Sequence, residues 1–403
     1  MTVRERLRFE GTDETHRVTS LELFFDLVFV YALTQVTALM AADPTSTGLA
    51  RGVVILGMLW FAWCSFAWLG NQAKADEGLL RLGLVVAMVS MFVVALSVPE
   101  AFDDLPGGLH SPLVFALAII LVRLVHLAVY LIAAGDDMQL RRQLGLTAVP
   151  VAVWAVLLVA GAILDGGTQL LVWLLALTAD YAGIYLGGVK GWRLNAPSHF
   201  AERHGLIIIV ALGESIVALG VGATGLPVTA PLLAAVVLGL IASVCMWWAY
   251  FDVVAPVAER VLARRQGAER VRLARDSYTY LHFPMVAGIV FFALGLKKVI
   301  GYVADSAEHD LSDALTGVPL ASLYGGVVLY LLALVAFRLR NVGSVNWQRV
   351  VVASLLLALL PVAWRVPALG SLALLTAVLV GLIAYEVTRF AEARHAVRHA
   401  GHE

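Results

Sequence analysis

Charged residues are scarce in this chain. Only 14% of its 403 residues are Asp, Glu, Lys or Arg, whereas 61% are hydrophobic. Soluble globular domains carry about a quarter charged residues, and the mean hydropathy here is +0.87. These values exclude a soluble globular protein and indicate a polytopic membrane protein surrounded by lipid. The formal net charge of −1 offers no basic surface for nucleic acid, so no nucleic-acid partner is expected.

The chain has only two cysteines and lacks the common catalytic motifs. Cys64 and Cys245 both fall in apolar runs, which is typical of buried small residues rather than of a disulfide or a metal site. There is no Walker loop, HExxH motif or Cys/His cluster, and the G-E-S sequence at 213–215 has no histidine near it. We therefore expect no cofactor and no metal. The sequence leaves enzymatic activity open and favours a protein that is not an enzyme.

Long apolar runs make up most of the sequence. Each has about the length that a bilayer demands of one helix. There are twelve, at residues 19–41, 49–71, 79–98, 111–134, 145–165, 168–188, 202–223, 229–253, 278–301, 318–338, 347–364 and 367–387. The predicted fold class is therefore all-α, a polytopic membrane protein with about twelve transmembrane helices.

The basic residues give the orientation of these helices. With the N-terminus inside, 23 of the 28 Lys and Arg residues fall in inside segments and four in outside segments, and Arg123 lies mid-helix. This follows the positive-inside rule and predicts that both termini are inside. Residues 1–18 and 391–403 are then cytoplasmic tails. The polar start of the chain is unlike a secretion signal.

Two halves of the sequence resemble each other weakly. LRLGLVVAMVS at 80–90 is similar to LHFPMVAGIVF at 281–291, and each opens the third helix of its half. We expect six-helix halves at 19–195 and 196–390, related as parallel repeats because an even number of crossings returns the chain to the same side. The alternative is that apolar helices of low diversity always align a little.

The first apolar run, LELFFDLVFVYALTQVTALM at 21–40, contains two carboxylates. Glu22 and Asp26 are four residues apart and therefore share a helix face. A carboxylate in hydrocarbon costs a few kcal/mol at least, so this face should be covered by protein or water.

The helix expected at 202–223 carries a second acidic set. Glu202, Arg203 and His204 lie at its cytoplasmic edge, and Glu214 is twelve residues further, which is about 18 Å along a helix and near the midplane. An ionisable residue at that depth is a functional candidate. The alternative is a protonated or paired structural glutamate.

Arg123 and His126 share a face of the fourth helix, three residues apart. Because arginine stays charged, Arg123 needs a carboxylate partner, and the candidates are Asp26, Asp180 and Glu214. The resulting ion pair could fix helix packing or serve transport. His282, at the cytoplasmic edge of the ninth helix, is expected to pair with Glu202 or Glu22.

Four segments resemble the bacterial low temperature requirement protein A (LtrA) family: LELFFDLVFVYALTQ at 21–35, HFAERHGLIIIVALGESIVAL at 199–219, WWAYFD at 247–252 and YLHFPMVAG at 280–288. The resemblance spans essentially the whole chain and implies a protein of the bacterial cytoplasmic membrane, with a name taken from cold growth but no settled substrate. The matching positions are Glu22, Phe25, Asp26, Glu202, Arg203, His204, Gly205, Gly213, Glu214 and His282.

A more distant likeness links FFDLVFVYALT to potassium channels that carry an FSD motif in their first helix. In those channels two six-helix repeats place their first helices along the pore. Here Phe25 replaces the serine, and the second half has Glu202–Gly205 where an FSD would stand, so the resemblance does not extend to a symmetric pore.

These observations favour a cation channel or a proton-coupled transporter with an acidic pathway between the first and seventh helices. Its candidate residues are Glu22, Asp26, Arg123, His126, Asp180, Glu202, Arg203, His204, Glu214 and His282. The expected partners are membrane lipids and a small ion or solute, and the chain is either a monomer or a homo-oligomer. The alternatives are an enzyme acting on a lipid or isoprenoid and a non-transporting protein of cold or stress adaptation.

Overall fold

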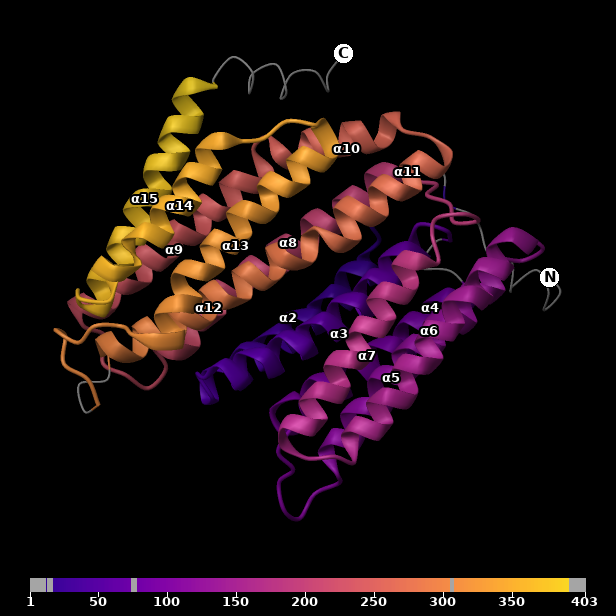
Figure 1. Ribbon diagram of the computed structural model, residues 1–403, viewed down its shortest axis with the longest axis horizontal. Coiled ribbons are helices and arrows are strands. Elements are labelled where there is room, and N and C mark those ends of the chain that lie inside the picture. Colours follow the sequence, from indigo (N-terminus) through magenta and orange to yellow (C-terminus); the bar gives the residue numbers. More distant parts are fainter. Residues whose placement is uncertain (1–11, 13–16, 74–77, 305–307, 391–403) are drawn as a thin grey trace. The chain divides into compact units, whose positions relative to one another are not determined.

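The computed structural model describes residues 12, 17–73, 78–304 and 308–390. The expected tails, 1–18 and 391–403, lie outside this part apart from residues 12, 17 and 18. The helices are α2 (Ser20–Ala42), α3 (Ser46–Gly70), α4 (Gly78–Ser97), α5 (Ser111–Ala133), α6 (Met138–Ala162), α7 (Gly166–Leu186), α8 (Pro197–Gly222), α9 (Ala230–Phe251), α10 (Val254–Arg264), α11 (Gly267–Leu273), α12 (His282–Ala304), α13 (Gly317–Val342), α14 (Trp347–Ala363) and α15 (Ala368–Arg389) (Figure 1).

Eleven helices in the described ranges are long and apolar enough to cross a membrane, and α14 is a shorter apolar helix of 17 residues. The prediction of an all-α polytopic membrane protein is thereby confirmed. The sidedness of the termini and the repeat relation between the halves stay predictions.

The chain divides into two compact units. Unit 1 comprises Met1–Leu39, Thr47–Arg203 and Arg265–Arg275, and unit 2 comprises Met40–Ser46, His204–Arg264 and Asp276–Glu403. The first turns of α8 therefore belong to unit 1 and the remainder of that helix to unit 2. The expected halves, 19–195 and 196–390, stay a prediction, because this division rests on contacts rather than on internal similarity.

Unit 1 has a buried helix at its centre. The side chains of α3 are buried from Val54 through Ala67, and α4 packs on α5 while α6 packs on α7. The outer face of α4 is apolar, with Leu82 and Val89 about 60% exposed. An exposed apolar stripe of this kind suits lipid contact, since a soluble protein rarely leaves such a surface uncovered.

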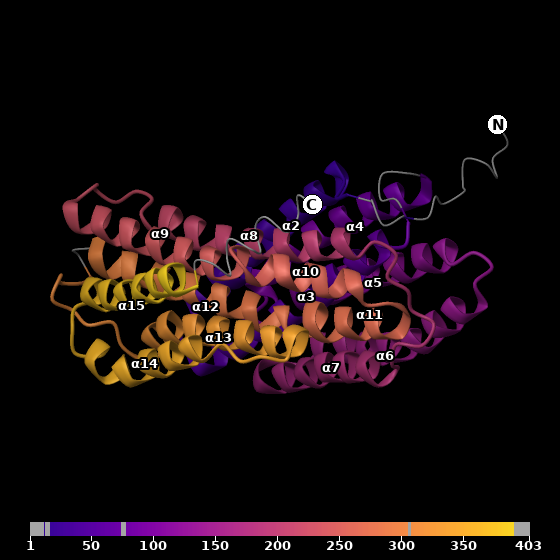
Figure 2. The same ribbon diagram turned by 90° about the horizontal axis from the view of Figure 1, so that it is seen from above.

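Unit 2 is organised around α12 and α13, which have the most extensive helix–helix contact in the chain and run side by side in both ribbon views (Figures 1 and 2). Glycines permit this approach. A Cβ atom on Gly288 would lie 2.6 Å from the carbonyl oxygen of Gly326, and one on Gly295 would collide with the backbone of Leu323. Close backbone contact through small residues is the usual way for membrane helices to associate.

Several helix boundaries differ from those expected. The helix α6 starts at Met138 rather than 145, because the side chain of Asp137 caps it by accepting hydrogen bonds from the amides of Gln139 and Leu140. The helix α8 starts at Pro197 rather than 202. A π-helical segment, Ala274–Tyr280, precedes α12. The short helices α10 and α11 lie in a segment that was expected only as an inside loop.

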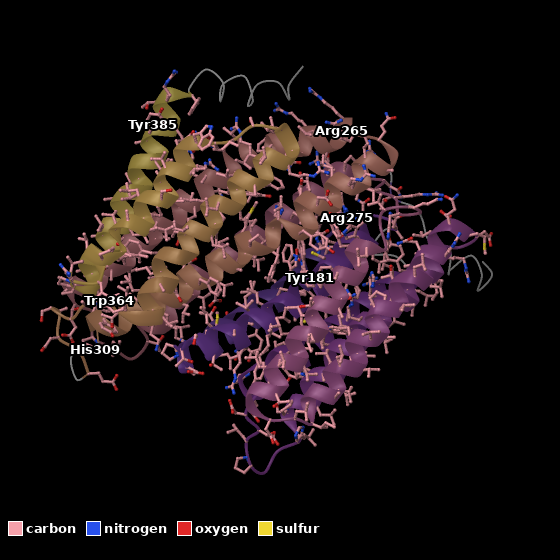
Figure 3. The ribbon with its side chains drawn as sticks, viewed as in Figure 1. Tyr181, Arg265, Arg275, His309, Trp364 and Tyr385 are labelled. Atoms are coloured by element: carbon pink, nitrogen blue, oxygen red, sulfur yellow. The ribbon has the colours of Figure 1, made fainter. Side chains whose placement is uncertain are left out.

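We expect α14 to cross the membrane despite its length. Its 17 residues extend about 26 Å, close to the roughly 30 Å hydrocarbon thickness. Trp347 and Trp364 flank it and are 68% and 54% exposed, as interfacial anchors would be. Trp364 lies at the same end of unit 2 as His309, and Tyr385 lies at the opposite end (Figure 3).

Labelling of single cysteines with a membrane-impermeant maleimide tests this crossing. In a chain with Cys64→Ala and Cys245→Ala, a Gln266→Cys variant should label only from the cytoplasmic side. An Arg365→Cys variant, in the turn between α14 and α15, should label only from outside. Labelling of both positions from one side would contradict the crossing.

Candidate functional site

The start of α2 fixes Glu22 in place. The hydroxyl of Thr19 accepts a hydrogen bond from the backbone amide of Glu22 at 3.3 Å, and the Glu22 carboxylate accepts one from the Thr19 amide at 2.9 Å. This reciprocal arrangement is a capping box, which satisfies two amide groups at the helix start. Asp26 follows one turn later on the same face, so the two carboxylates are held side by side.

The start of α8 presents a complementary pair. Pro197 occupies the first helical position, where a missing amide hydrogen does no harm. Starting the helix there brings His199 onto it, four residues before Arg203 and on the same face. The first turns of α8 therefore offer an imidazole and a guanidinium at the spacing at which α2 offers two carboxylates.

The two pairs meet in a buried group that we call the acid–arginine cluster: Glu22, Asp26, Trp63, His199 and Arg203, all of unit 1. Arg203 bridges the carboxylates, with Nη1 2.9 Å from Glu22 Oε1 and Nη2 2.9 Å from Asp26 Oδ1. The Nε2 atom of His199 lies 3.1 Å from both Glu22 oxygens. Trp63 donates its indole N–H to Asp26 Oδ1 at 2.8 Å.

Every member of the cluster is at most 2% exposed. Gly70 lies directly against the Glu22 carboxylate, and a Cβ atom there would collide with it. The second oxygen of Asp26, Oδ2, is buried and has no hydrogen-bond partner among the described residues. Two carboxylates thus share one guanidinium, and one carboxylate oxygen keeps unused acceptor capacity in a place without bulk water.

A second buried ion pair lies in unit 1. Arg123 Nη2 is 3.1 and 3.3 Å from the two oxygens of Asp180, so Asp180 is the partner among the three carboxylates considered. The other terminal nitrogen donates to Ser65 Oγ and to the carbonyl of Phe61. The guanidinium also lies over the Phe61 and Trp154 rings, which adds cation–π attraction. This pair ties α5 to α7 and α3.

His126 lies one turn after Arg123 on α5 and is buried. Its ring packs edge-on against the rings of Phe66 and Tyr130, with centroids 5.6 and 5.5 Å away. His126 is thus close to the second ion pair in sequence but belongs to an aromatic neighbourhood.

The histidines of unit 2 have different partners from those expected. The pairing of His282 with Glu202 or Glu22 is wrong, because its Nε2 lies 2.9 Å from the Tyr250 hydroxyl and its Nδ1 lies 3.1 Å from the Ser277 carbonyl. A carbonyl only accepts, so Nδ1 carries the hydrogen and Nε2 accepts from the tyrosine. The ring of His204 packs edge-on against that of His282, with centroids 5.1 Å apart.

The two remaining candidates do not join the cluster. The side chain of Glu202 is exposed, so the expected acidic face on the seventh helix does not include it. Glu214 is 2% exposed and lies about three turns beyond Arg203 on α8, in unit 2. The structure therefore brings together Glu22, Asp26 and Arg203, pairs Arg123 with Asp180, and places His204 beside His282.

Sequence reasoning missed His199, Trp63 and Ser65. The spacing of four between His199 and Arg203 could be seen in the sequence. Because the apolar run was taken to begin at residue 202, His199 was left outside the expected helix. Trp63 and Ser65 lie within the run WFAWCSFAW at 60–68. Nothing in that run distinguishes a side chain that bonds to a buried charged group from one that only packs.

Replacing Arg203 should destabilise the protein strongly. Arg203→Gln leaves Glu22 and Asp26 buried without their counter-charge, and breaking a buried pair costs about 3–5 kcal/mol. Thermal unfolding in detergent measures the change. The matched control is Glu269→Gln, since the Arg265–Glu269 pair is more than half exposed on both sides and should change stability by about 1 kcal/mol or less. Equal melting temperatures for all three proteins would contradict this account.

Arg123 and Asp180 should behave as a coupled pair. Arg123→Gln or Asp180→Asn alone should each cost about 3–5 kcal/mol, because each strands a buried charge. The double variant should cost clearly less than the sum of the two, since no unpaired charge remains. The same unfolding assay gives the coupling energy, and strictly additive losses would show that the two charges do not interact.

Comparisons with known proteins identify the family of this chain. The family described as "Bacterial low temperature requirement A protein (LtrA)" matches residues 17–384. The chain is also 27% identical over 330 residues to "Uncharacterized protein RA0937" of Rhizobium meliloti (strain 1021), covering 79% of this chain and 78% of that protein. No solved structure matches the chain significantly. Because the match extends over nearly the whole chain, this polytopic membrane protein belongs to the bacterial LtrA family.

Proposed function

We propose that this protein is a proton-coupled membrane transporter and that the acid–arginine cluster is its proton-binding site. The observation that supports this is the charge balance of the cluster. Glu22 and Asp26 supply two negative charges, and Arg203 supplies one positive charge between them. With both carboxylates ionised and His199 neutral, one negative charge is left over in a buried place, where an uncompensated charge is costly. A single added proton makes the cluster neutral.

Two atoms are suited to hold that proton. Asp26 Oδ2 is buried and lacks a partner in the described part of the chain, so protonation there breaks no existing hydrogen bond. His199 faces both oxygens of Glu22 at 3.1 Å, so a protonated imidazole would be paired at once. The other oxygen of Asp26, Oδ1, accepts hydrogen bonds from Arg203 and Trp63. Transfer between Asp26 and His199 would move the charge across Arg203 from α2 to α8.

Proton binding would change how strongly α2 holds α8. In the charged state Arg203 is shared between two carboxylates, and in the neutral state one carboxylate suffices. A coupled transporter needs such a two-state element, because a ligand shifts an equilibrium only by its differential affinity for the two states. The cluster supplies this difference at the contact between the two helices that were expected to line the pathway.

A cation channel fits this geometry less well. An alkali cation needs several oxygen ligands, whereas Arg203 already occupies one oxygen of each carboxylate and would repel a second cation. The hypothesis of an enzyme acting on a lipid would be favoured by a head group held against Arg203, His204 and His282. The guanidinium of Arg203 is 1% exposed and paired with two carboxylates, so a head group cannot reach it.

Proton flux in proteoliposomes tests the proposal. Purified protein is reconstituted with a pH-sensitive dye inside, and an inward proton gradient is imposed with and without a membrane potential. Wild type should acidify the lumen faster than protein-free vesicles. Asp26→Asn should fall to the rate of protein-free vesicles, because a fixed amide keeps the cluster permanently neutral. Glu202→Gln, one residue from Arg203 but exposed, is the matched control and should behave as wild type.

Parallel vesicles with potassium or sodium gradients separate the alternatives. Potassium or sodium flux that persists at constant pH would favour the channel. A folded wild-type protein that moves no proton under any condition would contradict the proposal, as would an Asp26→Asn variant with wild-type flux. Size-exclusion profiles and melting temperatures establish that each variant is folded.

A further inference from the structure

A cavity of about 390 Å³ lies in unit 2, and no residue of the acid–arginine cluster lines it. It is formed by the end of α9, by α10, by the end of α13, and by the facing ends of α14 and α15. Its volume is within the range of small-molecule sites, which are mostly apolar with a few placed polar groups. Much of the wall is apolar, with Trp248, Val254 and Phe337 among its members.

Three arginines at this end of unit 2 differ in their partners. Arg340 pairs with Asp276 at 2.9 Å, and Arg349 pairs with Glu386 through two bonds of 2.8 and 2.9 Å. Arg338 lines the cavity and donates its Nε to Ser344 Oγ at 3.0 Å, but it forms no ion pair with any described residue. Asp252 and Glu386 also line the cavity, but Glu386 is bonded twice to Arg349, so the half-buried Arg338 keeps donors from which a further anion can accept hydrogen bonds.

Asn341, one turn further on α13, is a second polar residue of the cavity wall. Its amide nitrogen donates to Ser277 Oγ at 3.1 Å and to the Phe337 carbonyl at 2.7 Å, which fixes the orientation of the amide. Its carbonyl oxygen is buried and has no donor in the described ranges. The cavity therefore offers a cation beside an unused hydrogen-bond acceptor, so a fitting ligand carries an anionic group beside a hydroxyl.

The position of the cavity favours a lipid over a dissolved solute. It lies where helices end on the side that the positive-inside rule assigns to the cytoplasm. Trp347 and Phe390, at these same helix ends, are 68% and 40% exposed, as residues of an interfacial aromatic belt are. The helix α10 buries Val254, Ala258 and Leu262 on one side, the spacing of a helix that lies along a membrane surface.

We propose that this cavity binds the head group of an anionic phospholipid that carries hydroxyl groups, of the phosphatidylglycerol type. Arg338 pairs with the phosphate, and a head-group hydroxyl donates to Asn341. Basic pockets between membrane helices on the cytoplasmic side hold anionic head groups by the same electrostatics. This inference is independent of the proposed proton site, since the two share no residue.

Lipid binding to the purified protein in detergent tests the proposal. Native mass spectrometry is used to titrate phosphatidylglycerol, phosphatidylcholine and glycerol 3-phosphate against wild type, Arg338→Gln and Arg340→Gln. Wild type should bind phosphatidylglycerol in preference to phosphatidylcholine. Arg338→Gln should weaken that binding about tenfold, because it removes a charge-assisted contact. Arg340→Gln, whose arginine is already paired, should bind as wild type.

A second variant keeps the test decisive where Arg338→Gln fails to fold. Val257→Trp fills the cavity from α10 without altering a charge and should also abolish the phosphatidylglycerol preference. Equal binding of both phospholipids to wild type would overturn the proposal, as would undiminished phosphatidylglycerol binding to a folded Arg338→Gln or Val257→Trp protein. Tighter binding of glycerol 3-phosphate than of the lipid would also overturn it and identify a site for a dissolved anion.

Discussion

The guanidinium of Arg203, held between Glu22 and Asp26, is the interaction on which the rest of unit 1 depends. Two carboxylates in an apolar helix could not be buried without it, because an isolated buried charge is far costlier than a paired one. The cluster also gives a purpose to three local features: the capping box at Thr19, the proline that begins α8 before His199, and the glycine that makes room beside Glu22. Together these fix where α2 and the first turns of α8 lie in unit 1.

The two buried ion pairs of unit 1 differ in a way that bears on function. Arg123 and Asp180 have one charge of each sign, and one terminal nitrogen of Arg123 also donates to Ser65 and Phe61, so the charges of the pair cancel and it suits a structural role. With both carboxylates ionised and His199 neutral, the acid–arginine cluster has an odd charge, and one of its acceptor oxygens has no donor among the described residues. Selection for stability alone tends to remove such an imbalance, whereas a site that takes up and releases a proton requires one.

The class of the protein and most helix positions were readable from the sequence, because bilayer thickness constrains apolar runs by length alone. The pairing of Glu22 and Asp26 on one face followed from their spacing. What covers that face did not, because the partner of a buried charge is chosen by helix packing, which periodicity does not encode. Arg338 shows the same limit. As one of many inside arginines it carried no special signal, and only the partners of Arg340 and Arg349 set it apart.

The glycine contacts between α12 and α13 have a consequence for motion. With the backbone of Gly288 against that of Gly326, sliding of the two helices would bring side chains into collision, so we expect the pair to move as one body. His282 lies on α12, and Arg338 and Asn341 lie on α13. We therefore expect the mutual geometry of these residues to be preserved when the pair moves. The π-helical turn at Ala274–Tyr280 leads directly into α12, and its Ser277 is bonded to both His282 and Asn341, so we expect this turn to move with the pair.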